Sequence, residues 1–214
     1  MYLSTNDLRK ETISSCARII IQGKFTFILK IIERELLKVM LPIPTYLKVL
    51  LHPQGEDNNE FYVTGDIICP CGENHFNVYY VGDLIDNAVR VCEHEGHYYL
   101  TIAVKCSKCK MFHLIFDENQ HGWNGFVCRE TDVPLYEPFQ LWTCPECKGH
   151  THKLSTHLHS EGKSDFIEEI NFEAEGERVF TEEDWVNGFS WITISTQCTH
   201  CQFEDPKWID YETM

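Results

Sequence analysis

Two stretches of the chain, YLTIAVKCSKC at residues 99–109 and WITISTQCTHC at residues 191–201, repeat one pattern at an offset of 92 residues. In each stretch, alternating apolar residues typical of a strand lead into two cysteines separated by two residues. A further cysteine pair precedes each stretch, at Cys69-Pro-Cys71 and at Cys144-Pro-Glu-Cys147, and a histidine follows both pairs. Self-similarity of this kind predicts two tandem copies of one β-rich module.

The cysteine pairs have the spacing of tetrahedral metal sites. A structural Zn²⁺ ion is held by four thiolates, and two tight turns that each present two thiolates supply that geometry. We therefore predict two zinc sites, whose ligands are Cys69, Cys71, Cys106 and Cys109 in the first module and Cys144, Cys147, Cys198 and Cys201 in the second.

The first site departs from the second in one respect, because a single residue separates Cys69 from Cys71. The tighter turn is expected to rely on Gly72, and His75 is an alternative ligand if Cys71 points away. Two other uses of paired cysteines compete with zinc. A redox dithiol normally occurs once, at the start of a helix, and four-thiolate iron would colour the protein.

With these knuckles and their flanking strands, the sequence resembles the zinc-ribbon class. That resemblance implies two β-hairpin knuckles that clamp one zinc ion beneath a small antiparallel sheet. It covers about half of residues 60–214. The class implies zinc and β structure but no function, because ribbons occur as adaptors, as nucleic-acid readers and as inserts in enzymes.

The expected organisation is mainly β with an N-terminal helical segment. Residues 4–40 have apolar residues at helical spacing, and Pro42 and Pro44 end that pattern. We predict a helical leader at 1–44, a first zinc-ribbon-like module at 45–134 and a second at 135–214, with the connector near 131–138. Because the composition changes abruptly near Met40, translation starting there is a further hypothesis.

Charge constrains the partners of the chain. Residues 1–50 contain eight Lys or Arg and four Asp or Glu, whereas the rest contains ten and twenty-nine, for a net charge of −15. Such an acidic body repels phosphate backbones, so nucleic acid is an unlikely partner and a basic protein surface is the better match. The segment 161–184 is especially acidic, and its apolar residues Phe166, Ile170 and Phe172 suggest strands.

Eleven cysteines with no recognisable secretory leader indicate a reducing, cytoplasmic location. The longest apolar stretch, residues 25–43, carries five charged residues and is not expected to span a membrane. The oligomeric state is not readable from the sequence.

Three groups of residues outside the cysteine pairs have side chains that are able to bind a metal ion or transfer a proton. His94 and His97 surround an acidic turn beside Cys92, and the stretch from His150 to His159 holds four histidines in strand alternation. A solvated surface explains both groups more simply than a third metal. The loop from Phe116 to Phe126 contains Asp117 and His121, and its expected role is a turn that buries Trp123.

No catalytic motif with a known mechanism is present: the metalloprotease, nucleophile-elbow, P-loop and dinucleotide-binding patterns are all missing. The leading hypothesis is therefore a non-catalytic protein-interaction protein with two structural zinc ions. Two alternatives remain open. One is a hydrolytic or acid/base enzyme with a site between the modules near His121, and the other is a nucleic-acid adaptor that uses basic residues 9–48.

Overall fold

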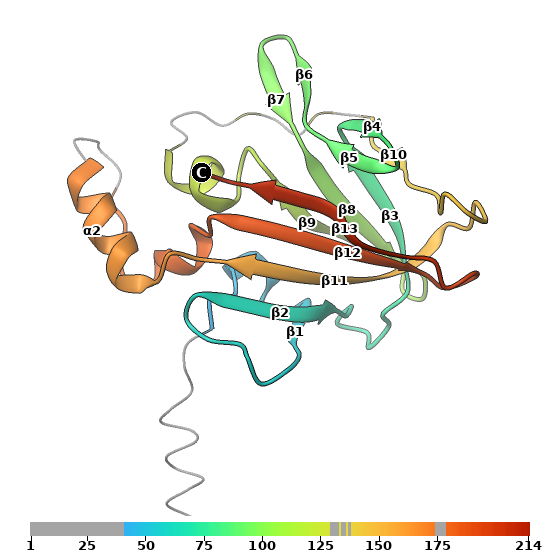
Figure 1. Ribbon diagram of the computed structural model, residues 1–214, viewed down its shortest axis with the longest axis horizontal. Helices are drawn as coiled ribbons and strands as arrows, with labels where there is room; N and C mark the ends of the chain where they lie inside the picture. The colour runs from blue at the N-terminus through green and yellow to red at the C-terminus, as the bar shows by residue number, and fades with distance from the viewer. Residues whose placement is uncertain (1–40, 129–132, 134–135, 137, 174–178) are drawn as a thin grey trace, which may run out of the picture. The chain divides into compact units, whose positions relative to one another are not determined.

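The computed structural model describes residues 41–128, 133, 136, 138–173 and 179–214 (Figure 1). Of the predicted helical leader at 1–44 only residues 41–44 are described, and of the predicted connector at 131–138 only residues 133, 136 and 138. Both sets of cysteines belong to one compact unit, residues 40–214.

Strands dominate this unit, as the sequence predicts. A 3-10 turn at Thr45–Leu47 comes first, and a short π-helix at Trp123–Cys128, an α-helix labelled α2 at Lys163–Glu173 and a second 3-10 turn at Asp184–Asn187 follow later. The strands are β1 (Leu51–Pro53), β2 (Tyr62–Ile67), β3 (Phe76–Val81), β4 (Asp83–Ile85), β5 (Ala88–Arg90), β6 (Cys92–His94), β7 (His97–Tyr99), β8 (Thr101–Cys106), β9 (Phe112–Asp117), β10 (Gln140–Leu141), β11 (Thr151–His159), β12 (Trp191–Cys198) and β13 (Glu204–Glu212).

Nine of these strands form one antiparallel sheet that contains two equivalent three-stranded units. In the first unit β3 pairs with β8 and β8 with β9, and in the second β11 pairs with β12 and β12 with β13. The units meet where Thr151 and His152 of β11 pair with Asn77 and Phe76 of β3. Further along, the same edge of β11 pairs with β2.

The predicted modules thus share strand pairing. Figure 1 shows β2 of the first segment lying beside β11 of the second. The division into modules at 45–134 and 135–214 rests on the sequence repeat, and as a statement about domains it stays a prediction. The sheet itself is continuous across the predicted boundary.

Period-two alternation places the main core on one face of the sheet. Along β11 the residues at even positions are buried, while those at odd positions are half-buried. The buried face joins neighbouring strands through apolar side chains, among them Leu154, Leu158, Ile192, Ile194, Val63, Ile67, Phe76 and Val104. Trp142 and Trp208 complete this core with rings 5.0 Å apart between centroids.

The sequence suggests strands in the acidic segment after Glu161, and that prediction is wrong. The first part of this segment is the helix α2, in which Phe166 and Ile170 are buried and pack in a cluster with Trp123 and Trp185. A spacing of four residues between the buried positions is the helical period, and this spacing outweighs the strand-like appearance of the segment. Beyond α2, Asp184 Oδ2 accepts bonds from both the N–H and the hydroxyl of Thr181, at the start of the 3-10 turn Asp184–Asn187.

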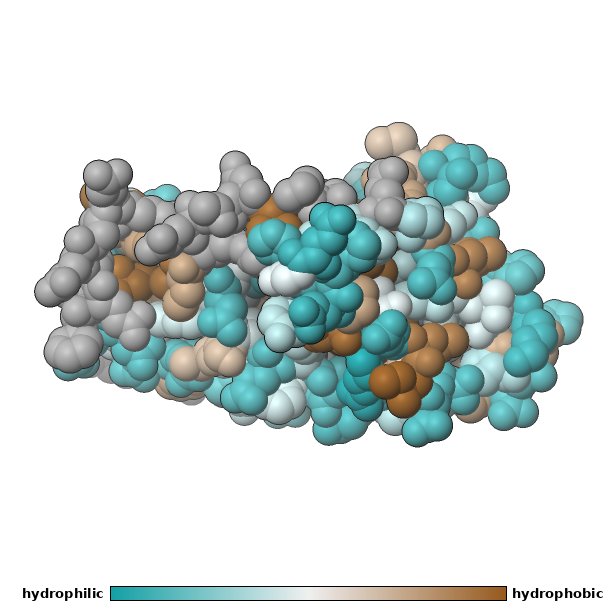
Figure 2. Space-filling model, turned by 90° about the horizontal axis from the view of Figure 1, so that it is seen from above, coloured by the Kyte–Doolittle hydropathy of each residue, from teal (hydrophilic) through white to brown (hydrophobic). Residues whose placement is uncertain are grey.

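Of the two small hairpins, β6–β7 projects at the top of Figure 1, whereas β4–β5 lies against the sheet, where Val89 of β5 belongs to the main core. Figure 2 looks onto the side from which β6–β7 projects. Hydrophilic and hydrophobic residues are interspersed over this view of the surface. Leu84, Ile85 and Tyr98 at the hairpins are at least half exposed. Among the described residues, no helix has the length and apolar character needed to cross a membrane.

Candidate metal centres

Three of the four cysteine pairs lie in the same backbone turn. The N–H of the first cysteine donates to the carbonyl five residues ahead, and its own carbonyl accepts from the N–H four residues ahead. These turns begin at Cys106, Cys144 and Cys198. The residue that makes the second bond has a positive φ in every case, at Lys110, Lys148 and Gln202. The repeat in sequence is therefore also a repeat in backbone geometry.

The pair Cys69/Cys71 uses a turn that is one residue shorter. Here the N–H of Cys69 donates to the carbonyl of Glu73, and the N–H of Gly72 donates to the carbonyl of Cys69, both at 2.8 Å. Gly72 has a φ of 83°, a left-handed conformation that glycine adopts without steric cost. The shorter spacing in the sequence is thus accommodated at this glycine.

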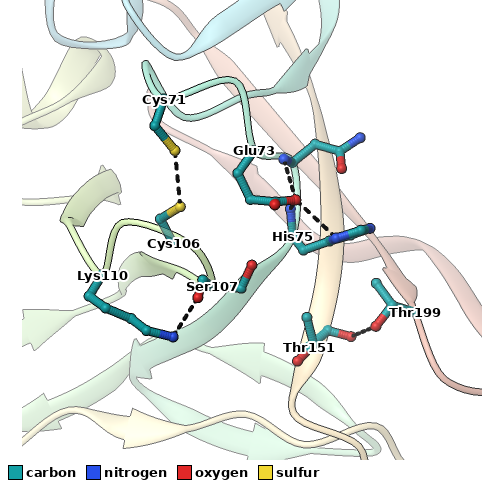
Figure 3. A network of polar contacts seen from close by, with 9 residues as sticks. Cys71, Glu73, His75, Cys106, Ser107, Lys110, Thr151 and Thr199 are labelled. Atoms are coloured by element: carbon teal, nitrogen blue, oxygen red, sulfur yellow. Dashed lines mark hydrogen bonds and ion pairs between the residues drawn. The ribbon is translucent and has the colours of Figure 1, made fainter.

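A matching hydrogen bond ties the two turns of each group together. The N–H of Ser107 donates to the carbonyl of His75 at 2.9 Å, and the N–H of Thr199 donates to the carbonyl of Thr151 at 3.0 Å. The Thr199 hydroxyl adds a second bond to the same carbonyl (Figure 3). In both groups the turn of the second cysteine pair is therefore bonded to the backbone just after the turn of the first pair.

This framework brings all eight cysteines into two groups of four. In each group the potential ligand atoms lie within 4.8 Å of one another. Close contacts join the first cysteine of one turn to the second of the other: Cys69–Cys109 at 3.5 Å, Cys71–Cys106 at 3.6 Å, Cys144–Cys201 at 3.5 Å and Cys147–Cys198 at 3.5 Å. Zn–S bonds of about 2.3 Å in a tetrahedron place sulfurs about 3.8 Å apart, so these groups fit a metal ion.

Backbone N–H groups help to hold one thiolate in each group. Burial raises the pKa of the Cys106 thiol, but hydrogen bonding to the backbone of Cys109 and Lys108 outweighs it and brings the pKa to about 7. Cys198 has a pKa of about 7 for the same reasons, with the backbone of Cys201 and His200 as its partners. A cysteine normally titrates near 8.5, so these are the thiols of each group that ionise first. Burial and sharing of a proton with neighbouring thiols raise the pKa of Cys69 and of Cys201 to about 12, so a metal ion would have to displace the protons of those thiols.

The first group has an additional imidazole beside it. His113 of β9 places its Nε2 atom 3.4 Å from the Sγ atom of Cys69. A metal-bound thiolate carries no proton, so Nε2–H must be the donor in that state. The corresponding position in the second unit is Asp205, because His113 pairs with Val104 of β8 as Asp205 pairs with Thr196 of β12. Sequence reasoning missed this histidine, since it follows no ligand spacing.

His75 lies away from the thiols. Its Nδ1 atom is 2.9 Å from Glu73 Oε1, and that oxygen also accepts from the backbone N–H of Asn74 and His75. Figure 3 shows Cys71 directed toward Cys106, with His75 on the other side of Glu73. The alternative in which His75 replaces Cys71 is thus not the arrangement that the structure adopts.

The other histidines of interest form no ligand group of three or more: within the described part of the chain, only the two cysteine groups do so. His94 and His97 face each other across the β6–β7 hairpin, exposed to solvent. On β11, His152 is fully buried whereas His157 and His159 lie on the opposite, half-buried face.

The loop around His121 is built as a structural turn. The backbone N–H of Asp117 donates to His121 Nδ1 at 3.0 Å, and the Tyr46 ring stacks on the imidazole with centroids 3.6 Å apart. Burial lowers the pKa of His121 to about 3. A base with that pKa is far from the value that favours proton transfer at neutral pH, so the geometry favours packing over acid/base chemistry. Trp123 is buried here, as predicted.

Comparisons with known proteins do not assign the chain to a family. No protein-family model, no curated protein and no solved structure matches the chain. The likeness to zinc ribbons rests on the cysteine turns and the strands beside them. The structure supports a β-rich chain with two groups of four cysteines, each placed to hold one metal ion.

Proposed function

We propose that this chain is a zinc-binding, non-catalytic protein-interaction protein, an adaptor or regulator, whose two zinc ions are structural. One observation carries the proposal: eight cysteines converge in two groups of four, with sulfur contacts of 3.5–3.6 Å. Four thiolates complete the tetrahedral shell of Zn²⁺ and leave no position for water or substrate. Sites of that kind stabilise a fold, and reduced thiols of this number suit a cytoplasmic location.

Element analysis of the purified protein tests the metal part of the proposal. The expected result is two zinc ions per chain, lost together with the folded state when a strong chelator is added under reducing conditions. A colourless protein with zinc would separate this site from four-thiolate iron, which absorbs visible light. Protein from a metal-replete cell that holds iron, or no metal, would contradict the proposal.

The surface supports an interaction role through its charge. On α2 the side chains of Asp165 and Glu168 are exposed, and Glu182 and Glu183 are exposed nearby in sequence. The ion pair between Lys163 and Glu182 neutralises only one of these carboxylates. With a net charge of −15, the chain matches a protein with a basic surface and repels nucleic acid.

A charge-neutralised variant tests that partner. Asp165→Asn, Glu168→Gln and Glu183→Gln together are expected to slow association with a basic partner, most strongly at low salt, because peripheral charges act mainly on encounter. The matched control replaces Glu56, Asp57 and Glu60 in the exposed loop before β2, with the same change in charge. Proteins captured equally by both variants and by the unmodified chain would argue against α2 as the docking surface.

A further inference from the structure

The half-buried face of β11 and its neighbours carries a regular array of polar side chains. Strand register places one row across the sheet, Thr64–His157–Thr193–Asp210. The adjacent row is Tyr62–His159–Trp191–Glu212. The two imidazoles are neighbours on one strand face, since side chains at positions i and i+2 of a strand point the same way. Both line a single hollow over β11, β12 and β13.

Each imidazole is held by a hydroxyl at the same ring nitrogen. The Nδ1 atom of His157 lies 2.6 Å from Thr64 Oγ1, and that of His159 lies 2.9 Å from Ser190 Oγ. Ser190 donates its own hydrogen to the carbonyl of His159, at 3.3 Å, so its oxygen accepts from His159 Nδ1–H. Within the described residues, the hydrogen bonds of both rings involve Nδ1 alone, which leaves the two Nε2 atoms for a ligand.

An imidazole fixed at one nitrogen by a hydrogen-bond partner is the arrangement found where histidine binds a metal. The partner sets the tautomer and the ring orientation, and the opposite nitrogen then presents its lone pair. His159 is already in this state, and His157 reaches it when Nδ1–H donates to Thr64. Burial and the neighbouring His159 lower the pKa of His157, which keeps the ring neutral and its lone pair available at pH 7.

The charges of this surface are on balance negative, although those of the hollow itself are balanced. Asp210 and Lys207 both line the hollow and form an ion pair at 3.0 Å, and Asp210 also accepts bonds from Trp191 Nε1 at 2.7 Å and Thr193 Oγ1 at 3.0 Å. An adjoining hollow on the same strands adds carboxylates at Asp66, Glu204 and Asp205 and one lysine at Lys153. Carboxylates therefore outnumber lysines along this surface, which disfavours a phosphate and favours a positive ion.

We propose that His157 and His159 form an open chelate for a divalent transition-metal ion, distinct from the two thiolate groups. Imidazole nitrogen is a ligand for Zn²⁺, Cu²⁺ and Ni²⁺ rather than for the hard ions Mg²⁺ and Ca²⁺. Two protein ligands leave the remaining coordination positions to water or to an exogenous ligand. The ion held here is exchangeable, whereas a four-thiolate site is closed.

Calorimetric titration with Zn²⁺ tests the site on the full-length protein that already holds metal in both thiolate groups. The unmodified protein is expected to bind one further equivalent more weakly than the first two. His157→Gln combined with His159→Gln should abolish that equivalent while leaving two zinc ions and the near-UV spectrum unchanged. The matched control is His94→Gln with His97→Gln, which removes an exposed cross-strand pair whose His94 instead contacts Glu95 and Tyr136.

Two further variants separate a built site from two accessible histidines. Thr64→Val and Ser190→Ala each remove one Nδ1 partner without touching a ligand, and each is expected to weaken the third equivalent by about 10–100-fold. Nitrogen-15 spectra of the imidazoles should show Zn²⁺ shifting Nε2 of His157 and His159. The proposal is overturned if no third equivalent binds, if the His157/His159 variant still binds it, or if binding is lost in the His94/His97 control.

Discussion

At the scale of single residues, the two metal groups differ in what lies beside their sulfurs. His113 approaches Cys69 in the first group, while Asp205 holds the corresponding place in the second. A hydrogen bond to a thiolate reduces its negative charge and fixes its orientation, and loss of a partner of this kind typically lowers metal affinity by about 10–100-fold. The repeated chain has therefore diverged at a position that contacts a ligand.

Replacing His113 by Phe is expected to weaken metal binding in the first group by about 10–100-fold and to leave the second group unchanged. The reason is the loss of the Nε2–H bond to Cys69. Stepwise competition with a chromogenic chelator measures the two affinities separately. Asp205→Asn serves as the control at the equivalent position, and equal affinities in all three proteins would show that His113 only fills space.

His152 is a second residue where the copies differ. It pairs with Cys198 as Phe76 pairs with Cys106, and neither ring nitrogen of this fully buried imidazole has a hydrogen-bond partner among the described residues. Burial is the main cause that lowers its pKa, to about 4, so the folded state holds the ring neutral. The stability that depends on this neutrality is complete above the unfolded pKa of about 6.5 and is lost as the pH falls toward 4.

We therefore predict that His152→Phe raises the free energy of unfolding at pH 7 by about 1 kcal/mol, because it removes two unpaired polar atoms and copies the side chain of the other unit. The variant should also keep about 2 kcal/mol that the unmodified protein loses between pH 7 and pH 5. Urea titrations at both pH values, with the metal content fixed, measure the two effects. A variant with the same acid sensitivity as the unmodified chain would contradict this explanation.

At the scale of elements, the turns and strands that depend on neighbouring residues could be predicted from the sequence. The gap of two residues between Cys144 and Cys147 specifies a turn, and the alternation around Thr193 specifies a strand; both are present in the structure. The pairing of β11 with β2 could not be predicted, because a strand's alternation shows which face is buried but not which edge it pairs with.

The helix α2 and the partner of Cys69 were missed for related reasons. Phe166 and Ile170 have helical spacing, but two apolar positions among many charged residues are a weak signal for a helix. Their packing partners Trp123 and Trp185 are distant in the sequence, so the buried face of the helix could not be identified. His113 occupies an ordinary alternating strand position, and only the folded hairpin brings it to a cysteine 44 residues away. Contacts set by tertiary structure leave no spacing signal in the sequence.

The second metal group stabilises more of the sheet than the first, because the strand β11 that follows its first turn pairs with three other strands. β11 pairs with β12 along one edge and with β2 and β3 along the other, and its first residues follow the turn at Cys144. We predict that Cys198→Ser reduces hydrogen-exchange protection in β2 as well as in β12, because metal-binding energy here is folding energy. The matched variant Cys106→Ser should affect β8, β9 and the end of β2, since Cys69 of the first group follows β2 directly, and it should spare β12 and β13. Unchanged protection of β12 in Cys198→Ser would show that the sheet forms without the second metal.

At the scale of the whole molecule, both cysteine groups and every strand in the described part of the chain lie between Leu51 and Glu212. We predict that deletion of residues 1–39 leaves two metal ions per chain and the strand content intact, since no ligand and no described strand is removed.

The deletion removes seven basic and four acidic residues, so the shortened chain is more negative than the −15 of the full sequence. Its association with a basic protein should therefore be faster at low salt, and the difference should fade as salt screens the charges. Element analysis, circular dichroism and association rates at two salt concentrations check these outcomes. Loss of the near-UV signal, or of either metal ion, would show that the first 39 residues contribute to the fold.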